Sequence, residues 1–321
     1  KGVAFSNGGV SSAFWFNDLS ARSFLEAYLP SNLDYDQYKM TLNLNFPEMI
    51  NQKIYTNGVV TKIDLTNFKV QFPETYNSSA LYFHTAPNGR YPESQFVYHS
   101  IDGRDIPVTA YSANTSTDLA EVKKEVLKSM TTLETLYGPF LHQTLTVFIA
   151  GSGGMEYCGA TMTSLWALNH ELTHSYFARG GLMPANGNAG WLDEAITSWS
   201  DEGRTSRPDL KGMYSNMAGN SEYRRFTHGD AYTYGKAFMA HLNYKFQANG
   251  GLASFLNEMI QKDLFKPMTT EEFINKISTH YSEDLTTLFK TFTYSSRAPN
   301  GPVIQRPVHM KMTIEEMREF L

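Results

Sequence analysis

The segment His170-Glu171-Leu172-Thr173-His174 has the pattern H-E-x-x-H, and the interpretation of the whole chain starts from it. Four residues advance a helix by slightly more than one turn, so His170 and His174 share a face and can bind one ion. Glu171 points away from that pair, close enough to reach a water on the metal but not to act as a ligand. Zinc lowers the pKa of such a water to about 7, and a carboxylate can then accept its proton. The segment predicts a zinc-binding helix with Glu171 as the general base.

The residues around this segment favour the metal site over a solvated helix that carries two histidines by chance. Apolar Leu168, Leu172 and Tyr176 occupy neighbouring turns, and Gly180-Gly181 ends the helix. A second short helix then follows in Trp191-Leu-Asp-Glu-Ala-Ile196, and it supplies a carboxylate. We therefore expect one zinc ion per chain.

The third ligand is either Asp193 or Glu194, since adjacent helix positions point about 100° apart and only one of them can face the ion. We assign Glu194, because Trp191, Ala195 and Trp199 would line the buried side next to it. Asp193 would then be a surface residue or a residue that orients a ligand.

The first third of the chain has the pattern of β-strands. Met40, Leu42, Leu44 and Phe46 alternate with polar residues, which is a period of two. Asn57-Gly58 and Asp102-Gly103 are signals for tight turns between strands. These features predict an antiparallel sheet or sandwich over residues 35–110.

The pattern changes to helices near residue 115. Apolar residues at helical spacing predict a helix that begins near Thr117 and ends at Gly138-Pro139, and residues 145–150 predict one more strand. Further helices are expected at 164–179, 191–202, 230–247, 251–262, 269–280 and 283–293. The class is α+β, with a β-rich domain over 1–112, a catalytic domain over 113–295 and a C-terminal tail with a short helix over 296–321.

Composition narrows the classes of function. The net charge of −5 over 321 residues argues against a dedicated nucleic-acid binder, and no apolar stretch is long enough for a membrane helix. The single cysteine, Cys158, excludes an intramolecular disulfide and leaves cytoplasmic, periplasmic and secreted locations open. The chain opens with Lys1-Gly2, so we expect that an initial segment has been removed. The oligomeric state is not indicated.

Four motifs in order resemble the aminopeptidase N and leukotriene hydrolase family of gluzincin zinc peptidases. That family carries G-x-M-E-N, H-E-x-x-H, W-L-N-E-G and Y-x-K-G-F elements. This chain has Gly153-Gly154-Met155-Glu156-Tyr157, His170 to His174, Trp191-Leu192-Asp193-Glu194-Ala195 and Tyr234-Gly-Lys-Ala-Phe238. Similarity extends to Ala21-Arg22-Ser-Phe-Leu25 and to the segment between Thr270 and Phe292, and covers roughly residues 10–293.

The resemblance implies a partial N-terminal β domain followed by a thermolysin-like, mainly helical catalytic domain. It also implies that Gly153, Gly154, Met155 and Glu156 bind a peptide, with Glu156 pairing with its free amino terminus. Tyr234 would stabilise the oxyanion, with Tyr232 as the competing choice. We expect that the chain lacks the first part of the family's β domain and the helical C-terminal domain of larger members.

The chain also departs from the family. Nineteen residues separate His174 from Glu194, one more than is usual there and the spacing of thermolysin-like peptidases. Tyr157 and Asp193 both stand where the family commonly has Asn.

The remaining candidates have simpler explanations. His228 fits a loop histidine better than a fourth ligand, and Cys158 fits a small packing residue better than a redox-sensitive thiol. The other histidines lack partners at ligand spacing and are expected to be structural or exposed; they are His84, His99, His142, His241, His280 and His309.

The sequence therefore predicts a zinc metallopeptidase acting on peptides, and most specifically an aminopeptidase. A thermolysin-like endopeptidase and a non-catalytic peptide-binding protein of the same fold are the alternatives. An intact Glu171 argues against the second alternative.

Overall fold

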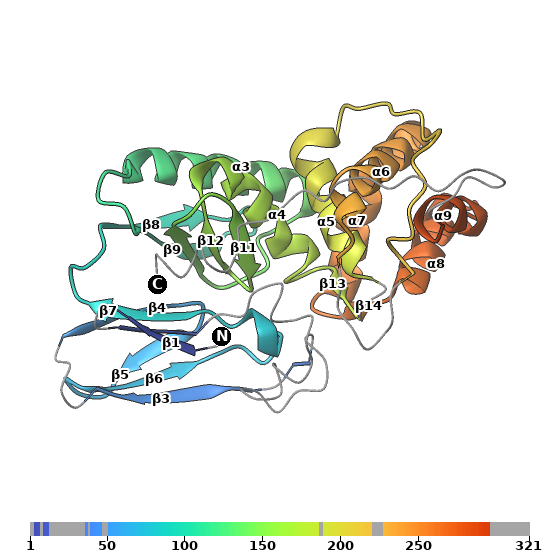
Figure 1. The fold of residues 1–321 in the computed structure, drawn as a ribbon. Helices are drawn as coiled ribbons and strands as arrows, with labels where there is room; N and C mark the ends of the chain where they lie inside the picture. The colour runs from blue at the N-terminus through green and yellow to red at the C-terminus, as the bar shows by residue number, and fades with distance from the viewer. Residues whose placement is uncertain are drawn as a thin grey trace. The chain divides into compact units, whose positions relative to one another are not determined.

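The computed structural model describes residues 3–6, 9–12, 36–37, 39–46, 51–185, 189–219 and 227–295. The predicted C-terminal tail and the Ala21 to Leu25 segment lie outside these ranges. Within them, antiparallel sheets come first, a mixed sheet follows, and helices dominate the remainder (Figure 1). This arrangement confirms the predicted α+β class.

Two antiparallel sheets form the N-terminal part. Four strands make the first sheet, in the order β1 (Val3–Ser6), β2 (Gly9–Ser12), β7 (Phe83–Pro87) and β4 (Gln52–Thr56). Three strands make the second, in the order β3 (Thr41–Asn45), β6 (Asn67–Gln71) and β5 (Val59–Lys62). In β3 the polar positions are exposed, while Leu42 and Leu44 are half-buried against a cluster that contains Val70 and Phe72. The predicted period of two is confirmed there.

The Asn57-Gly58 prediction was correct in placing a connection between two strands, but the connection is not a hairpin. These residues connect β4 to β5, which belong to different sheets, so they form no hairpin. The buried Asn57 side chain donates to the carbonyl oxygens of Ala80 and Cys158 and accepts from the Tyr82 N–H. Asn57 therefore serves as an anchor between segments distant in the sequence. Asp102-Gly103 does connect a hairpin, and Gly103 has a φ of 84°.

A five-stranded mixed sheet carries the residues of greatest interest. Its order is β11 (Gly154–Tyr157), β12 (Ala160–Thr163), β10 (Leu145–Ile149), β9 (Asp105–Ser112) and β8 (Glu93–His99). β10 runs parallel to both of its neighbours, and β11 is an edge strand. Aromatic rings join this sheet to the first one, because Tyr111 stacks between Tyr55 and Phe148 with centroid separations of 3.8 and 4.4 Å. The short Tyr82–Tyr111 hydroxyl contact lies in the same core.

Helix α3 (Leu119–Tyr137) lies along this sheet (Figure 1) and ends where Gly138-Pro139 was predicted to end it. Its buried Glu134 accepts hydrogen bonds from the Tyr98 and Ser100 hydroxyls and from the N–H of Ile101. One carboxylate thus ties the helix to the end of β8 and its turn.

The later part of the chain is helical, as predicted. Helix α4 (Leu168–Phe177) follows the 3₁₀ turn η2 (Leu165–Ala167). The others are α5 (Gly190–Ser198) with a π-helical turn over Trp199–Gly203, α6 (Tyr234–Lys245) after the 3₁₀ turn Gly229–Tyr232, α7 (Gly251–Asp263), α8 (Thr270–Tyr281) and α9 (Thr286–Thr293). Short strands Met183–Pro184 and Pro267–Met268 pair in parallel. No helix within the described ranges is long and apolar enough to cross a bilayer.

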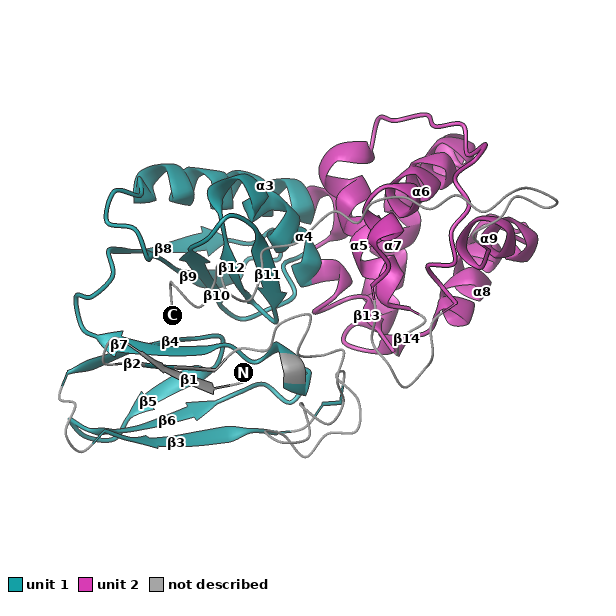
Figure 2. Ribbon diagram, in the orientation of Figure 1, with its two compact units in different colours: residues 1–134, 139–175, 311–321 teal, residues 135–138, 176–310 magenta. Residues whose placement is uncertain are grey.

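Two compact units divide the chain (Figure 2). Unit 1 contains residues 1–134, 139–175 and 311–321, and unit 2 contains residues 135–138 and 176–310. The boundary after Ser175 falls inside α4. The domain limits predicted from the sequence stay a prediction.

Candidate active site

The two histidines of the H-E-x-x-H segment lie together on helix α4. Apolar side chains bury the helix, since Leu168, Leu172 and Tyr176 are each 1% exposed. The Nε2 atoms of His170 and His174 are 3.2 Å apart, and the two rings meet edge to face. His174 is buried and His170 half-buried. Helical spacing therefore brings two imidazole nitrogens to one point, as the segment predicts.

His142 holds the end of this helical segment in unit 1. Its Nε2–H donates to the backbone oxygen of Ser175 over 3.1 Å, because a carbonyl can only accept. Burial lowers the pKa of His142 to about 4, so the ring is neutral at pH 7. Tyr76 and Phe140 pack edge-on against it. The sequence predicted that His142 is either structural or exposed, and the structure shows it buried and bonded to α4.

Glu171 lies against the backbone of strand β11. A Cβ added to Gly154 would lie 2.5 Å from both Cδ and Oε1 of Glu171, so the Glu171 side chain would have to move. Glu171 itself is only 3% exposed. Gly154 is therefore required so that the carboxylate can approach the strand edge, a role that the spacing of glycines alone did not reveal.

Glu156 lies two residues beyond Gly154 on the same strand, and alternate positions share a face. It is fully buried, and one ligand atom from each of Glu156, Glu171 and His174 lies within 4.8 Å of the others. The edge strand β11 thus places its carboxylate beside the predicted general base, within unit 1. Two desolvated carboxylates at this separation favour a positively charged group between them.

In unit 2, helix α5 carries the predicted third ligand. All nine of its residues are buried, so Asp193 is not a surface residue, and burial does not distinguish it from Glu194. The Tyr232 hydroxyl donates to Glu194 Oε1 over 2.6 Å. A carboxylate fixed in this way by a phenol has the arrangement of a metal ligand held by an outer partner. The sequence raised Tyr232 only as a rival to Tyr234, and no spacing signal pointed to this bond.

The segment around Tyr234 packs closely on α5. A Cβ added to Gly235 would lie 2.7 Å from the Cβ of Ala195, next to Glu194 in the sequence. This glycine therefore lets the start of α6 approach α5 closely. The role of Tyr234 as an oxyanion donor stays a prediction.

Other candidates have the simpler roles expected of them. His228 caps a 3₁₀ turn by accepting from the N–H of Asp230. Cys158 is buried with Tyr76 and Ala80, and its thiol donates to Asn77 Oδ1 over 3.3 Å. Burial lowers the pKa of His84, packed among aromatic rings, to about 4.

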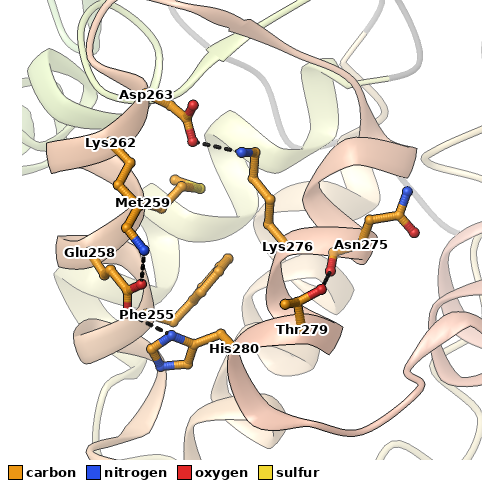
Figure 3. Close-up of a pocket in the computed structure, with 9 residues that line it drawn as sticks. All are labelled: Phe255, Glu258, Met259, Lys262, Asp263, Asn275, Lys276, Thr279 and His280. Carbon is orange, nitrogen blue, oxygen red and sulfur yellow. Dashed lines mark hydrogen bonds and ion pairs between the residues drawn. The ribbon is translucent and has the colours of Figure 1, made fainter.

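A separate pocket of about 290 Å³ lies in unit 2 between α7 and α8 (Figure 3). Its charged groups pair with one another: Lys276 Nζ with Asp263 Oδ2 at 2.8 Å, and Glu258 with both Lys262 and His280. None of the site residues predicted from the sequence lines it. Phe255 and Met259 add apolar lining beside these pairs.

Comparison with known proteins gives matches in structure but none in sequence. Neither protein-family models nor curated protein sequences match this chain. Among solved structures, an M1 zinc metallopeptidase mutant from Deinococcus radiodurans bound to a Tyr-Ser-Ala substrate matches with a TM-score of 0.72 and 16% identity; the match covers 94% of this chain and 73% of that one.

Two further solved structures are similar in the same way. Yeast LTA4 hydrolase matches with a TM-score of 0.67 and 15% identity, over 93% of this chain and 51% of that one. Aminopeptidase A from Legionella pneumophila, in complex with aspartic acid, matches with a TM-score of 0.65 and 17% identity. That match covers 92% of this chain but only 38% of the Legionella protein. The predicted resemblance to the aminopeptidase N and leukotriene hydrolase family is therefore confirmed at the level of the fold.

Proposed function

We propose that this chain is a zinc-dependent metallopeptidase, with His170, His174 and Glu194 as ligands. The observation that carries the proposal is the 3.2 Å separation of the two histidine Nε2 atoms. Two zinc–nitrogen bonds of about 2.0–2.1 Å at a tetrahedral angle require roughly 3.3 Å between the nitrogens. Glu194, on α5, is the third ligand in this proposal, as the sequence assigns it. Two imidazoles and a carboxylate are a donor set of catalytic zinc sites, which keep a fourth position open.

In this proposal, three residues of the chain have separate roles in hydrolysis. Bound zinc would supply Lewis-acid chemistry that lowers the pKa of water and polarises a carbonyl. Glu171, beside Gly154, takes the proton of the attacking water and returns it to the leaving amine. Tyr234 donates its phenol to the oxyanion that develops on the substrate. Tyr232 holds Glu194 in one orientation through its 2.6 Å hydrogen bond.

Glu156 makes the enzyme an aminopeptidase in this proposal. A peptide's amino terminus carries a positive charge at neutral pH, and a desolvated cleft disfavours that charge unless a carboxylate meets it. Glu156 and Glu171 are both buried and close to each other, so their negative charges would attract an ammonium group far more strongly than an uncharged internal amide. The contact would also fix the register of the substrate, with its first peptide bond at the base.

The test compares free and amino-acetylated fluorogenic aminoacyl substrates, with and without a chelator. We expect hydrolysis of the free substrates, loss of it with the chelator, and at least about 100-fold lower kcat/KM on the acetylated ones. Glu156→Gln keeps the side chain's volume and removes its charge, so it should lower activity on free substrates by a similar factor while zinc stays bound. Glu121→Gln, on the exposed side of α3, is the matched control.

Two outcomes separate the alternatives. Rapid internal cleavage of a peptide blocked at both ends, insensitive to Glu156→Gln, would establish the thermolysin-like endopeptidase instead. A fully zinc-loaded protein that cleaves neither kind of peptide would leave only the non-catalytic, peptide-binding alternative.

A further inference from the structure

Strand β11 gives the direction in which a peptide would run past the general base. Gly154 and Glu156 occupy alternate positions, about 7 Å apart along the strand, and Glu171 lies against Gly154. A peptide whose amino terminus meets Glu156 therefore has its first carbonyl near Gly154. The residues after the cleaved bond continue toward Gly153, away from Glu156.

The segment that follows β12 is fixed at that outgoing end. The N–H of Ser164 donates to the carbonyl oxygen of Gly153 over 2.7 Å, which extends the β11–β12 pairing by one residue. The 3₁₀ turn η2 begins immediately afterwards, and the N–H of Ala167 bonds back to the oxygen of Ser164. The turn thus lies next to the path of the leaving peptide.

Trp166, in the middle of this turn, is 78% exposed, more than any other large apolar side chain of the described residues. Its successors Ala167 and Leu168 are buried, so the turn is anchored while the indole faces solvent. The turn passes into α4 with helical backbone at Leu168. Trp166 is therefore four residues before His170, in the turn that leads directly into α4.

We propose that Trp166 binds the side chain of the residue that follows the cleaved bond. An exposed indole one turn from the metal-binding histidines, at the outgoing end of the substrate strand, offers a flat apolar surface for an aromatic or large aliphatic side chain. The substrate class is then peptides with such a residue in second position. This inference rests on the proposed aminopeptidase function.

The experiment compares three substrates that share one well-cleaved first residue X: the aminoacyl amide X-amide, X-Phe-amide and X-Gly-amide. X-amide has no second residue and serves as the reference for each variant. We expect the wild-type enzyme to prefer X-Phe-amide over X-Gly-amide about tenfold in kcat/KM, the scale of one aromatic contact. Trp166→Ala should reduce this preference to within about twofold, and Trp166→Phe should keep most of it.

A control and a binding measurement complete the test. Ile101→Ala removes another exposed apolar side chain, in the β8–β9 turn, and should keep the wild-type preference. The ratio of dissociation constants for the two dipeptide amides, measured with the zinc-loaded Glu171→Gln variant, should show the same dependence on Trp166. A tenfold preference that survives Trp166→Ala would overturn the inference and leave the aminopeptidase intact. Failure to hydrolyse X-amide would count against the proposed function, and the binding ratios would still decide the role of Trp166.

Discussion

Helices α4 and α5 were both predicted to carry metal ligands, but the sequence specified which residues these are more completely for α4 than for α5. In α4 the candidate groups are four residues apart, so helical geometry alone assigns His170 and His174 to one face. In α5 the candidates are adjacent, and the whole helix is buried, so neither spacing nor burial separates Asp193 from Glu194. The structure adds a hydrogen bond to Glu194 from Tyr232, 38 residues further on, and our proposed assignment rests on it. Spacing thus predicts ligands that lie on different turns, whereas the proposed choice between two adjacent carboxylates depends on a residue distant in the sequence.

The largest expected effect tests the less certain of the two assignments, which is the choice between Asp193 and Glu194 on α5. Glu194→Ala should lower zinc affinity by more than about 100-fold, beyond the 10- to 100-fold typical of outer partners. Asp193→Ala should fall within that smaller range or below it. Metal analysis after dialysis against a weak chelator measures both. If Asp193→Ala releases zinc and Glu194→Ala retains it, Asp193 is the ligand and our assignment of Glu194 is wrong.

On α4, Glu171→Gln keeps the shape of the side chain and removes the proton acceptor. Turnover should fall about 100- to 10,000-fold, the range for a general base, while zinc remains bound. Steady-state kinetics and metal content on the same preparation provide the measurement. Near-normal turnover would exclude Glu171 from the proton transfer.

Tyr234→Phe and Tyr232→Phe separate the two tyrosines proposed to act with α5. Loss of an oxyanion donor at Tyr234 should lower kcat about 100- to 1000-fold with little change in KM, because the bond forms mainly in the transition state. Loss of the Tyr232 hydroxyl should instead weaken zinc binding about 10- to 100-fold, because it frees Glu194 to rotate. If Tyr232→Phe lowers kcat and Tyr234→Phe weakens zinc binding, Tyr232 is the oxyanion donor and Tyr234 orients the ligand.

Gly154→Ala tests whether the position of Glu171 on α4 depends on its close contact with strand β11. The new methyl group would overlap the Glu171 carboxylate, so the base must move while both histidines can stay. A displacement of about 1 Å can lower turnover by roughly 100-fold. Kinetics should show that loss with unchanged zinc content. Gly103→Ala, at a turn residue with a φ of 84° where a Cβ meets nothing within 4 Å, adds backbone strain away from the site and should leave turnover unchanged.

The sequence predicted the helices better than the connections that position the site. Apolar periodicity placed α3 and α6 to α9, and the H-E-x-x-H spacing placed the histidines. The β11–β12 hairpin has no alternating pattern, because both of its strands are buried on both faces, so only the family resemblance pointed to Glu156. Asn57-Gly58 misled because the preference of Asn and Gly for turns is local, whereas Asn57 is held by Ala80, Tyr82 and Cys158. Such long-range partners cannot be derived from neighbouring residues.

The smallest expected effect concerns what holds α4 in place, which is a hydrogen bond from the neutral, buried His142. Burial lowers its pKa to about 4, against an ordinary value near 6.5. Above about pH 6.5 the ring is neutral in the folded and unfolded states, so it adds no pH dependence. Between about pH 6.5 and 4, His142 binds a proton in the unfolded chain but stays neutral in the folded chain. The free energy of unfolding should therefore fall with falling pH, by up to about 1.4 kcal/mol per pH unit from this histidine.

Denaturant unfolding of the zinc-free protein between about pH 7 and pH 5 measures this slope, because removing zinc eliminates the pH dependence of metal binding. His142→Gln cannot take up the proton in either state, so its unfolding free energy should decline less steeply than that of the wild type, even though the variant is less stable throughout. His84 has the same lowered pKa and remains in both proteins, so its contribution cancels in the comparison. Parallel slopes for the two proteins would show that His142 takes up its proton equally in the folded and unfolded chains, and that α4 is not held by a neutral imidazole.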